Sequence, residues 1–311
     1  MTRALAWAVQ AAALLGACGT PAPPTASRTA PPAAAQSAAA PPARIAASAP
    51  ASIASPTIPS GPREFIVSGR QTQGGWVRGQ APAGTRSARL GTTALTLDAQ
   101  GRFFAAFDRN AGHSQTLVAE LADGRRVDKH LLVTPRAWQV EHVSIARQPG
   151  GPSAAFLARR APELAAIAGA RQVDTGAQGW RQDFRWPAQG RISGRFGAQR
   201  VYRGEPGAYH SGLDIAGGAG APYYAPADGV VVLAAATPFS LEGYLLIVDH
   251  GQGLNSAFLH STRLLVREGE TVRQGQQLGT IGATGRATGP HLHWSLVWRG
   301  HRLDPLLFLP E

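Results

Sequence analysis

The chain has 311 residues, long enough for two domains of ordinary size, and 44% of these residues are hydrophobic while 16% are charged. This balance excludes a wholly disordered chain and a protein that crosses a membrane many times. The single cysteine excludes a disulfide framework and a thiolate metal site, so any metal chemistry must use histidines and carboxylates.

The net charge of +11 suits an acidic partner, such as nucleic acid, anionic lipid or an acidic cell-wall polymer. Lys129 is the only lysine, and arginines spread along the chain supply the remaining positive charge. Because the basic residues are not gathered in one segment, we expect no nucleic-acid partner.

Residues 1–18 have the pattern of an export signal. A short basic start precedes an apolar run from Ala4 to Leu15 that is too short to span a bilayer, and Leu15-Gly16-Ala17-Cys18 follows it. This segment resembles the lipobox of a bacterial lipoprotein, which implies cleavage before Cys18 and lipid attachment to its sulfur. An ordinary signal peptide with an incidental cysteine is the alternative.

A lipidated Cys18 would hold the protein on a membrane of the cell envelope, on its periplasmic side. By analogy with other lipoproteins, Gly19 in place of an aspartate favours the outer membrane over the inner one. Residues 19–62 are almost entirely Ala, Pro, Ser and Thr, so this segment is expected to be a disordered tether. It would reach ~130 Å as a polyproline II helix and about 35 Å as a flexible coil.

Residues 63–147 carry short apolar runs separated by turn residues, and Asp123-Gly124 between two of them indicates a β-hairpin. The spacing predicts a small antiparallel β-sandwich. Examples of these runs are Phe65-Ile66-Val67, Ala94-Leu95-Thr96-Leu97, Phe103-Phe104-Ala105-Ala106-Phe107, residues 116–121 and His130-Leu131-Leu132-Val133.

Residues 148–185 are expected to form a connector. Its alanine-rich stretch from Pro152 to Arg171 predicts a helix, with Pro162 at a first-turn position that splits it in two.

The residues capable of chemistry lie in the segment 186–311. His210 and Asp214 are four residues apart, and His291 and His293 are two apart. On a strand, the side chains of His291 and His293 would lie on the same face and could reach a single position. Two imidazoles and one carboxylate suit an open zinc site, whose remaining position is left for water or substrate. A non-haem iron site uses the same ligand types, but it does not need the further histidines found here, and an exported protein lacks the cytosolic cosubstrates of such oxygenases.

Four segments of this region stand out together. They are Tyr209-His210-Ser211-Gly212-Leu213-Asp214-Ile215-Ala216, Ala225-Pro226-Ala227-Asp228-Gly229-Val230-Val231, Phe258-Leu259-His260-Ser261 and residues 282–294, which contain His291-Leu292-His293. In order, spacing and flanking glycines they resemble the lysostaphin-type, or LytM-type, zinc peptidases of peptidase family M23, and the resemblance covers about 120 residues, from Trp186 to Phe308.

The resemblance implies that His210, Asp214 and His293 bind one Zn²⁺ per chain and that His260 and His291 are catalytic. It also implies a mainly antiparallel β-domain with a groove that cleaves peptide bonds in the stems or cross-bridges of peptidoglycan. The fold class expected for the whole chain is therefore mainly β: a small N-terminal β-sandwich, a short helical connector and a C-terminal antiparallel β peptidase domain.

Two positions depart from the common family pattern. Phe258 stands where a tyrosine often precedes the catalytic histidine, and Trp294-Ser295 replaces a frequent Phe-Glu pair. His250 matches a family histidine without catalytic duty, so we expect a structural role for it.

Two classes of function stay open: a zinc endopeptidase of peptidoglycan, and a catalytically inactive relative that activates or binds other cell-wall hydrolases. Retention of all five site residues favours the enzyme. Cleavage of glycine-rich bridges or secreted proteins is a weaker third possibility. The sequence does not specify which bond is cut, how the two catalytic histidines divide their duties, what oligomer forms, or whether the N-terminal domain binds the wall, binds a protein partner or covers the groove.

Overall fold

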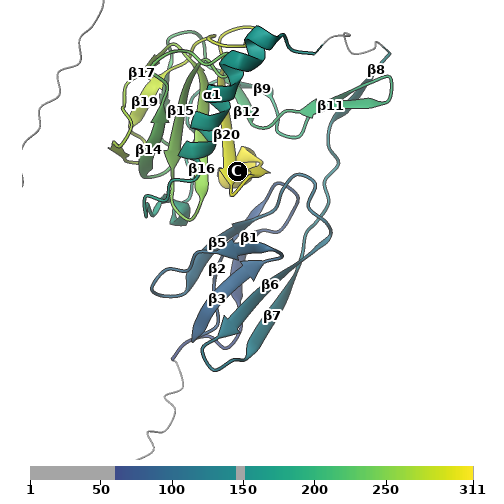
Figure 1. Cartoon of the computed structure of the whole chain (residues 1–311), viewed down its shortest axis with the longest axis vertical. Coiled ribbons are helices and arrows are strands. Elements are labelled where there is room, and N and C mark those ends of the chain that lie inside the picture. Colours follow the sequence, from purple (N-terminus) through teal and green to yellow (C-terminus); the bar gives the residue numbers. More distant parts are fainter. Residues whose placement is uncertain (1–59, 145–150, 311) are drawn as a thin grey trace, which may run out of the picture. The chain divides into compact units, whose positions relative to one another are not determined.

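The computed structural model describes residues 60–144 and 151–310. Strands dominate both described parts (Figure 1), which confirms the expected mainly β fold built from antiparallel sheets. The lipoprotein signal, Cys18 and the tether up to residue 59 lie outside the described residues. Within the described ranges, no helix has the length and apolar character needed to cross a membrane.

The N-terminal part, called the β-domain here (residues 60–138), consists of two antiparallel sheets that share one core. Inward-facing side chains from both sheets fill it, among them Val77, Phe103, Leu117 and Leu131. One sheet has the order β1-β2-β5, with β1 at Ile66–Arg70, β2 at Trp76–Gln80 and β5 at Arg102–Ala106. The other has the order β4-β3-β6-β7, with β3 at Thr85–Leu90, β4 at Thr93–Leu95, β6 at Ser114–Leu121 and β7 at Arg126–Leu132.

The turn signal at Asp123-Gly124 is confirmed as a hairpin, since β6 and β7 pair antiparallel on either side of it. Gly124 has a φ of 84°, a conformation that glycine adopts without strain. Strands β2 and β3 are not among the apolar runs named as examples from the sequence, because each mixes charged or polar residues with few apolar ones.

One strand of the expected β-sandwich lies elsewhere. Strand β8 (Val140–Val143) pairs in parallel with β10 (Gln199–Tyr202), which pairs antiparallel with β11 (Glu205–Tyr209). The segment 140–143 is mostly exposed, so it has no apolar face to bury in the sandwich. The sheet β11-β10-β8 therefore joins a segment predicted for the N-terminal domain to the C-terminal part of the chain.

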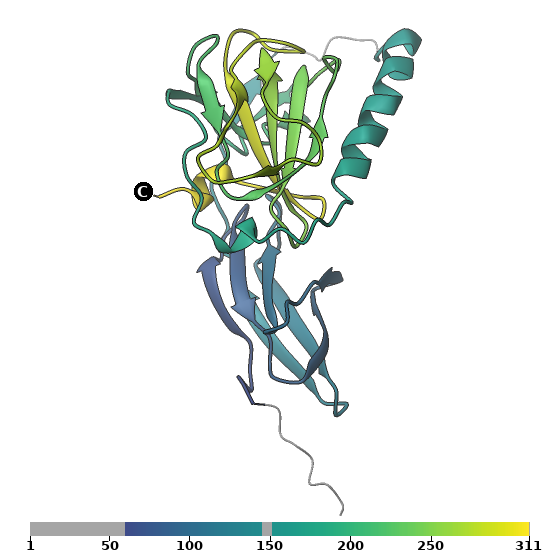
Figure 2. The same cartoon turned by 90° about the vertical axis from the view of Figure 1, so that its left-hand side faces the viewer.

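The predicted helix exists as α1 (Ala154–Ala170), but the expectation that Pro162 splits it is wrong. The hydroxyl of Ser153 caps the first turn by accepting a hydrogen bond from the Phe156 amide. Ile167 and Ala170 pack with strand residues of the C-terminal domain in one cluster, and Figure 2 shows α1 running beside that sheet. This packing offsets the local cost of a proline within the helix.

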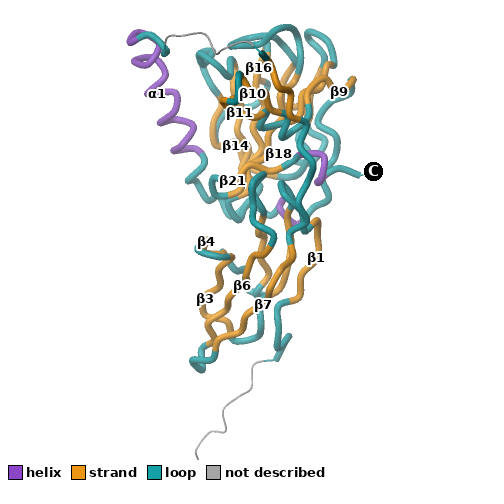
Figure 3. The backbone as a smooth tube through the Cα atoms, turned by 90° about the vertical axis from the view of Figure 1, so that its right-hand side faces the viewer, coloured by secondary structure: helices purple, strands orange, loops and turns teal. Residues whose placement is uncertain are grey.

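The C-terminal domain (residues 171–310) is organised around an eight-stranded sheet (Figure 3). Its strand order is β18-β14-β15-β16-β20-β12-β9, with β21 paired to β20. These strands are β9 (Arg191–Gly194), β12 (Leu213–Ala216), β14 (Gly229–Ala234), β15 (Tyr244–Asp249), β16 (Leu254–Ser261), β18 (Thr271–Val272), β20 (Leu292–Trp298) and β21 (His301–Leu303).

A smaller sheet, β13-β19-β17, covers part of the domain, and two short 3₁₀ helices complete the described elements. These elements are β13 (Pro222–Tyr224), β17 (Arg263–Leu264), β19 (Gln277–Thr280), η1 (Gly179–Arg181) and η2 (Pro305–Phe308). Trp180 and Phe184 in the expected connector are buried. The end of the connector is therefore part of the packed C-terminal domain.

The β-domain and the C-terminal domain bury a joint apolar cluster. The indole N–H of Trp76 donates to the Leu307 carbonyl at 2.9 Å, and the Trp76 and Phe308 rings lie 5.3 Å apart. Arg136 forms an ion pair with Asp304 at 2.7 Å, and the Asp304 side chain is buried. Apolar, aromatic and ionic contacts thus hold the two domains together.

Candidate metal and catalytic site

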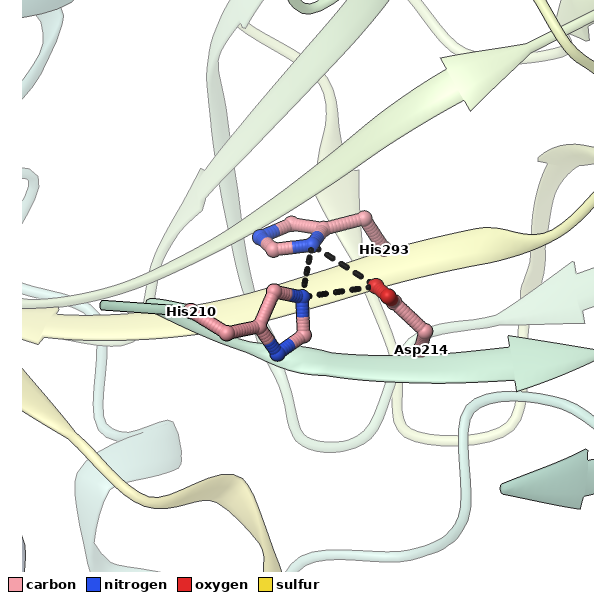
Figure 4. A group of neighbouring side chains, drawn as sticks. All are labelled: His210, Asp214 and His293. Carbon is pink, nitrogen blue, oxygen red and sulfur yellow. Dashed lines mark hydrogen bonds and ion pairs between the residues drawn. The ribbon is translucent and has the colours of Figure 1, made fainter. Parts of the chain in front are cut away.

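Three side chains of types that commonly bind metals converge where strands β12 and β20 pair (Figure 4). His210 directly follows β11, in the short turn before β12, while Asp214 lies within β12 and His293 lies within β20. The antiparallel register places Asp214 directly opposite His293. Strand pairing therefore brings together residues that are 79 positions apart in the sequence.

The three inward atoms form a compact triangle. His210 Nε2 lies 3.0 Å from Asp214 Oδ1 and 3.1 Å from His293 Nδ1, and His293 Nδ1 lies 2.8 Å from the same carboxylate oxygen. Zinc bonds of 2.0–2.1 Å in a tetrahedral site would place neighbouring ligand atoms about 3.3 Å apart. Because an opening of a few tenths of an ångström reaches that spacing, the residues fit a zinc ion.

The backbone fixes which nitrogen of His210 faces the site. His210 Nδ1 lies 3.0 Å from the carbonyl oxygen of Arg195, which can only accept a hydrogen bond. Nδ1 therefore carries a proton, and Nε2 is the nitrogen that faces Asp214 and that would be free to bind a metal in the neutral form of His210. An outer hydrogen bond of this kind is what orients a metal-binding histidine.

His293 uses its other ring nitrogen, and Gly212 explains how its ring fits. A Cβ atom at position 212 would lie 2.6 Å from His293 Nε2 and 2.6 Å from the Trp294 carbonyl. Only glycine leaves room there, so the Nε2 side of the His293 ring packs against the backbone of residue 212 while Nδ1 faces Asp214.

The electrostatics favour a charged carboxylate on Asp214 and a neutral imidazole on His293, whereas they favour the protonated form of His210. Burial alone would raise the pKa of Asp214, but hydrogen bonds from His210 and His293 outweigh it and hold that pKa well below its usual value. Burial lowers the pKa of His293. Burial also opposes protonation of His210, yet the hydrogen bond and charge of Asp214 raise its pKa overall. A metal would therefore compete with a proton on His210 as the pH falls.

His260 and His291 lie beside this triangle. Their ring centroids are 4.9 Å apart, His291 Nε2 is 3.7 Å from Asp214 Oδ1, and the His260 and His293 centroids are 6.2 Å apart. His260 Nδ1 donates to the Thr284 carbonyl at 2.9 Å, and His291 Nδ1 donates to the Gly289 carbonyl at 2.8 Å. Both rings thus keep Nε2 available as a proton acceptor when neutral. Burial lowers the pKa of His260, which favours its neutral form.

The structure places His250 away from this cluster. Its buried ring donates from Nδ1 to the Asp228 carbonyl at 2.7 Å, and Nε2 accepts from the Ser256 hydroxyl at 2.7 Å. Burial lowers its pKa, so the ring is a neutral bridge within the core. This arrangement agrees with the structural role expected for it.

The two departures from the family pattern both lie in the core. Phe258 is fully buried and stacks on Tyr223 with ring centroids 5.4 Å apart. Trp294 is also buried, and its indole N–H donates to Ser256 Oγ at 3.2 Å. Among the described residues, neither the Phe258 nor the Trp294 side chain forms a hydrogen bond with the three ligand candidates.

Sequence reasoning missed the carbonyl groups of Arg195, Thr284 and Gly289, which orient three of the five histidine and carboxylate side chains. Every residue has such a carbonyl, so its position carries no signal in the sequence. Only the fold reveals which ones face the site.

Comparison with known proteins agrees with this geometry. Residues 208–305 match the model of Peptidase family M23. The chain is 37% identical over 128 residues to the peptidoglycan DD-endopeptidase ShyA of Vibrio cholerae, over 40% of this chain and 28% of ShyA. It is 38% identical over 130 residues to the murein hydrolase activator NlpD of Escherichia coli, over 41% of this chain and 31% of NlpD. The match thus spans less than a third of either relative.

A solved structure shares more of the chain. A putative peptidase M23 from Pseudomonas aeruginosa superimposes with a TM-score of 0.58 at 28% sequence identity, over 77% of this chain and 94% of that one. The similarity therefore extends beyond residues 208–305.

Proposed function

Because residues 208–305 belong to peptidase family M23, we propose that the protein is a zinc-dependent endopeptidase that hydrolyses peptide cross-links or stem peptides of peptidoglycan. One observation carries the proposal. The His210, Asp214 and His293 triangle has two further histidines beside it, each with Nδ1 bound to a carbonyl and Nε2 available. A zinc peptidase needs both parts: a set of ligands with an open position and groups that transfer protons.

In this proposal the chain binds zinc through His210 Nε2, Asp214 Oδ1 and His293 Nδ1. Bound zinc supplies Lewis acidity, which activates water near neutral pH and polarises the scissile carbonyl.

The protein side chains transfer the protons and stabilise the oxyanion. Neutral His260 or His291 accepts the proton of the attacking water at Nε2. The resulting imidazolium donates a hydrogen bond to the oxyanion of the tetrahedral intermediate or returns a proton to the leaving amine. The carbonyls of Thr284 and Gly289 hold both rings in the orientation for these transfers.

An activator of other hydrolases is the second candidate, because the relative NlpD is named as one and matches as well as the endopeptidase ShyA does. The experiment that separates the two uses the purified chain on purified peptidoglycan, with no other hydrolase present, and identifies the fragments by mass. We expect cleaved peptide cross-links that disappear when a chelator is added. Fragments that form only when a second hydrolase is present would support the activator instead.

The cell-envelope location is part of the same proposal. A lipid on Cys18 would anchor the protein, and residues 19–62 would let the domains reach the wall, where the net charge of +11 favours acidic stem peptides. Replacing Cys18 with serine should release the protein from membranes while leaving digestion of isolated peptidoglycan unchanged. A Cys18→Ser protein that still pellets with membranes would refute the anchor.

A further inference from the structure

Arg109 is a buried cation of the β-domain whose side chain enters the C-terminal domain. It follows β5 and is only 6% exposed. Its Nη2 and Nε atoms donate to the carbonyl oxygen of Gly197 at 2.8 and 3.2 Å, and Nη2 also lies 3.3 Å from Gln199 Oε1. A buried guanidinium is costly unless its donors are used, so these contacts fix where the Gly197 carbonyl lies.

The segment that Arg109 contacts is the one that holds His210. The Gly197 amide donates to the His210 carbonyl at 2.8 Å, and the His210 amide donates to the Ala198 carbonyl at 2.8 Å. The Arg195 carbonyl accepts from His210 Nδ1 at 3.0 Å. Residues 195–198 therefore determine both the backbone position and the ring orientation of this ligand candidate.

A second set of contacts acts on the neighbours of His210. The Arg109 guanidinium lies over the Tyr209 ring at 4.7 Å and over the Trp138 ring at 5.0 Å. Gly197 has a φ of 83°, and a Cβ atom at that position would overlap the Trp138 ring. The β-domain side chains thus contact residues 197 and 209, on either side of the hydrogen bonds that hold His210.

We propose that Arg109 is a positioning residue for the metal site, through which docking of the β-domain holds His210 in its metal-binding orientation. The inference rests on the proposed function, because it takes His210, Asp214 and His293 as the zinc ligands. It assigns the β-domain a part in completing the site. A β-domain that served only as a spacer or a wall-binding module would have no effect on metal affinity.

Arg136 provides a matched control. It also belongs to the β-domain and also stacks on Trp138, at 4.6 Å, but it reaches Asp304 and the carbonyl of Gln73 rather than residues 195–198. Its removal would weaken domain docking without releasing the Gly197 carbonyl. Comparing Arg109→Met with Arg136→Met therefore separates positioning of His210 from general loss of interdomain contacts.

The test measures Zn²⁺ affinity of the full chain by competition with a chromophoric chelator, together with the thermal unfolding midpoint. Groups that orient metal ligands typically contribute 10–100-fold in metal affinity, so we expect Arg109→Met to bind Zn²⁺ about tenfold more weakly or worse. Arg136→Met should keep wild-type affinity even where its unfolding midpoint falls as much. Arg109→Lys, which keeps the charge and one donor, should recover part of the loss.

Wild-type Zn²⁺ affinity in a folded Arg109→Met chain, or equal weakening in both methionine variants, would overturn the inference. If Arg109→Met does not fold, Arg109→Gln replaces it with the same two outcomes. A wild-type chain that binds no Zn²⁺ would instead contradict the proposed metal site itself. The two failures are therefore distinguishable without any measurement of peptidase activity.

Discussion

His210 and His293 turn different ring nitrogens toward one another, with Nε2 of the first 3.1 Å from Nδ1 of the second. The Arg195 carbonyl occupies Nδ1 of His210, and the backbone at Gly212 lies against the Nε2 side of His293. Asp214 Oδ1 lies within 3.0 Å of both inward nitrogens. The Asp214 carboxylate thus contacts both of the other ligand candidates, so its loss should weaken metal binding the most.

Replacing Asp214 with alanine should abolish stoichiometric zinc binding. The substitution leaves two protein ligands, too few for either a structural or a catalytic zinc site. Metal analysis of the purified protein measures this directly. Full zinc occupancy in Asp214→Ala would refute the assignment of the ligands.

Replacing Gly212 with alanine should also weaken zinc binding, although residue 212 offers no ligand atom. Its new methyl group would lie 2.6 Å from His293 Nε2 and would force that ring to move. Gly169→Ala on α1 is the control, because a Cβ there meets nothing within 4 Å. Chelator competition should show a loss of affinity for Gly212→Ala and none for Gly169→Ala. Equal affinity in both variants would show that the His293 ring is not held by this contact.

Replacing His260 or His291 with alanine should preserve zinc and remove most activity. Each change deletes one Nε2 proton acceptor and leaves the three proposed ligands intact, which costs roughly 10²-fold or more in turnover. Zinc content and peptidoglycan digestion measured on the same preparation test both halves of the prediction. Turnover near the wild-type rate in either variant would remove that histidine from the catalytic role.

His250 should make folding stability depend on pH. Burial lowers its pKa below the unfolded value of about 6.5, so the unfolded state binds more protons as the pH falls through that range. The contribution of His250 to native-state stability is therefore fully present above pH ~6.5 and is lost progressively as the pH falls below it.

The comparison is between wild type and His250→Gln, both with excess chelator so that metal binding does not contribute. Denaturant unfolding across pH 5–8 should give a smaller loss at low pH for the variant, which has no imidazole at this position to protonate. Identical pH slopes would show that His250 is not a source of this dependence.

The five candidate site residues could be named from the sequence because their types and spacings are typical of a known chemistry, and the structure brings them close together. His210 and Asp214 are separated by four positions in the sequence. His293 lies on β20, the strand that pairs with β12, and the register Asp214↔His293 brings the residues together. His291, one residue before β20, and His293 within β20 both lie near the Asp214 carboxylate.

Other features depend on long-range packing that no local pattern encodes. The parallel pairing of β8 with β10 joins segments 59 residues apart, and nothing in Val140–Val143 indicates that β10 is its partner. Pro162 predicts a break, but α1 continues because Arg160 pairs with Glu242 at 2.6 Å and Ile167 packs on the sheet. Arg109 is one of many arginines, and only the fold shows that it is buried against Gly197.

The central claim is that this chain is itself a hydrolase, and a purified cross-linked muropeptide dimer tests it most directly. Wild-type protein alone, with one equivalent of Zn²⁺, should convert the dimer to two monomers by adding one water to a peptide bond, and mass spectrometry of the products identifies that bond. Asp214→Ala and His291→Ala under the same conditions should leave the dimer intact. An unchanged dimer with zinc-loaded wild-type protein, alongside stimulation of a separate wall hydrolase, would contradict the account and identify the protein as an activator.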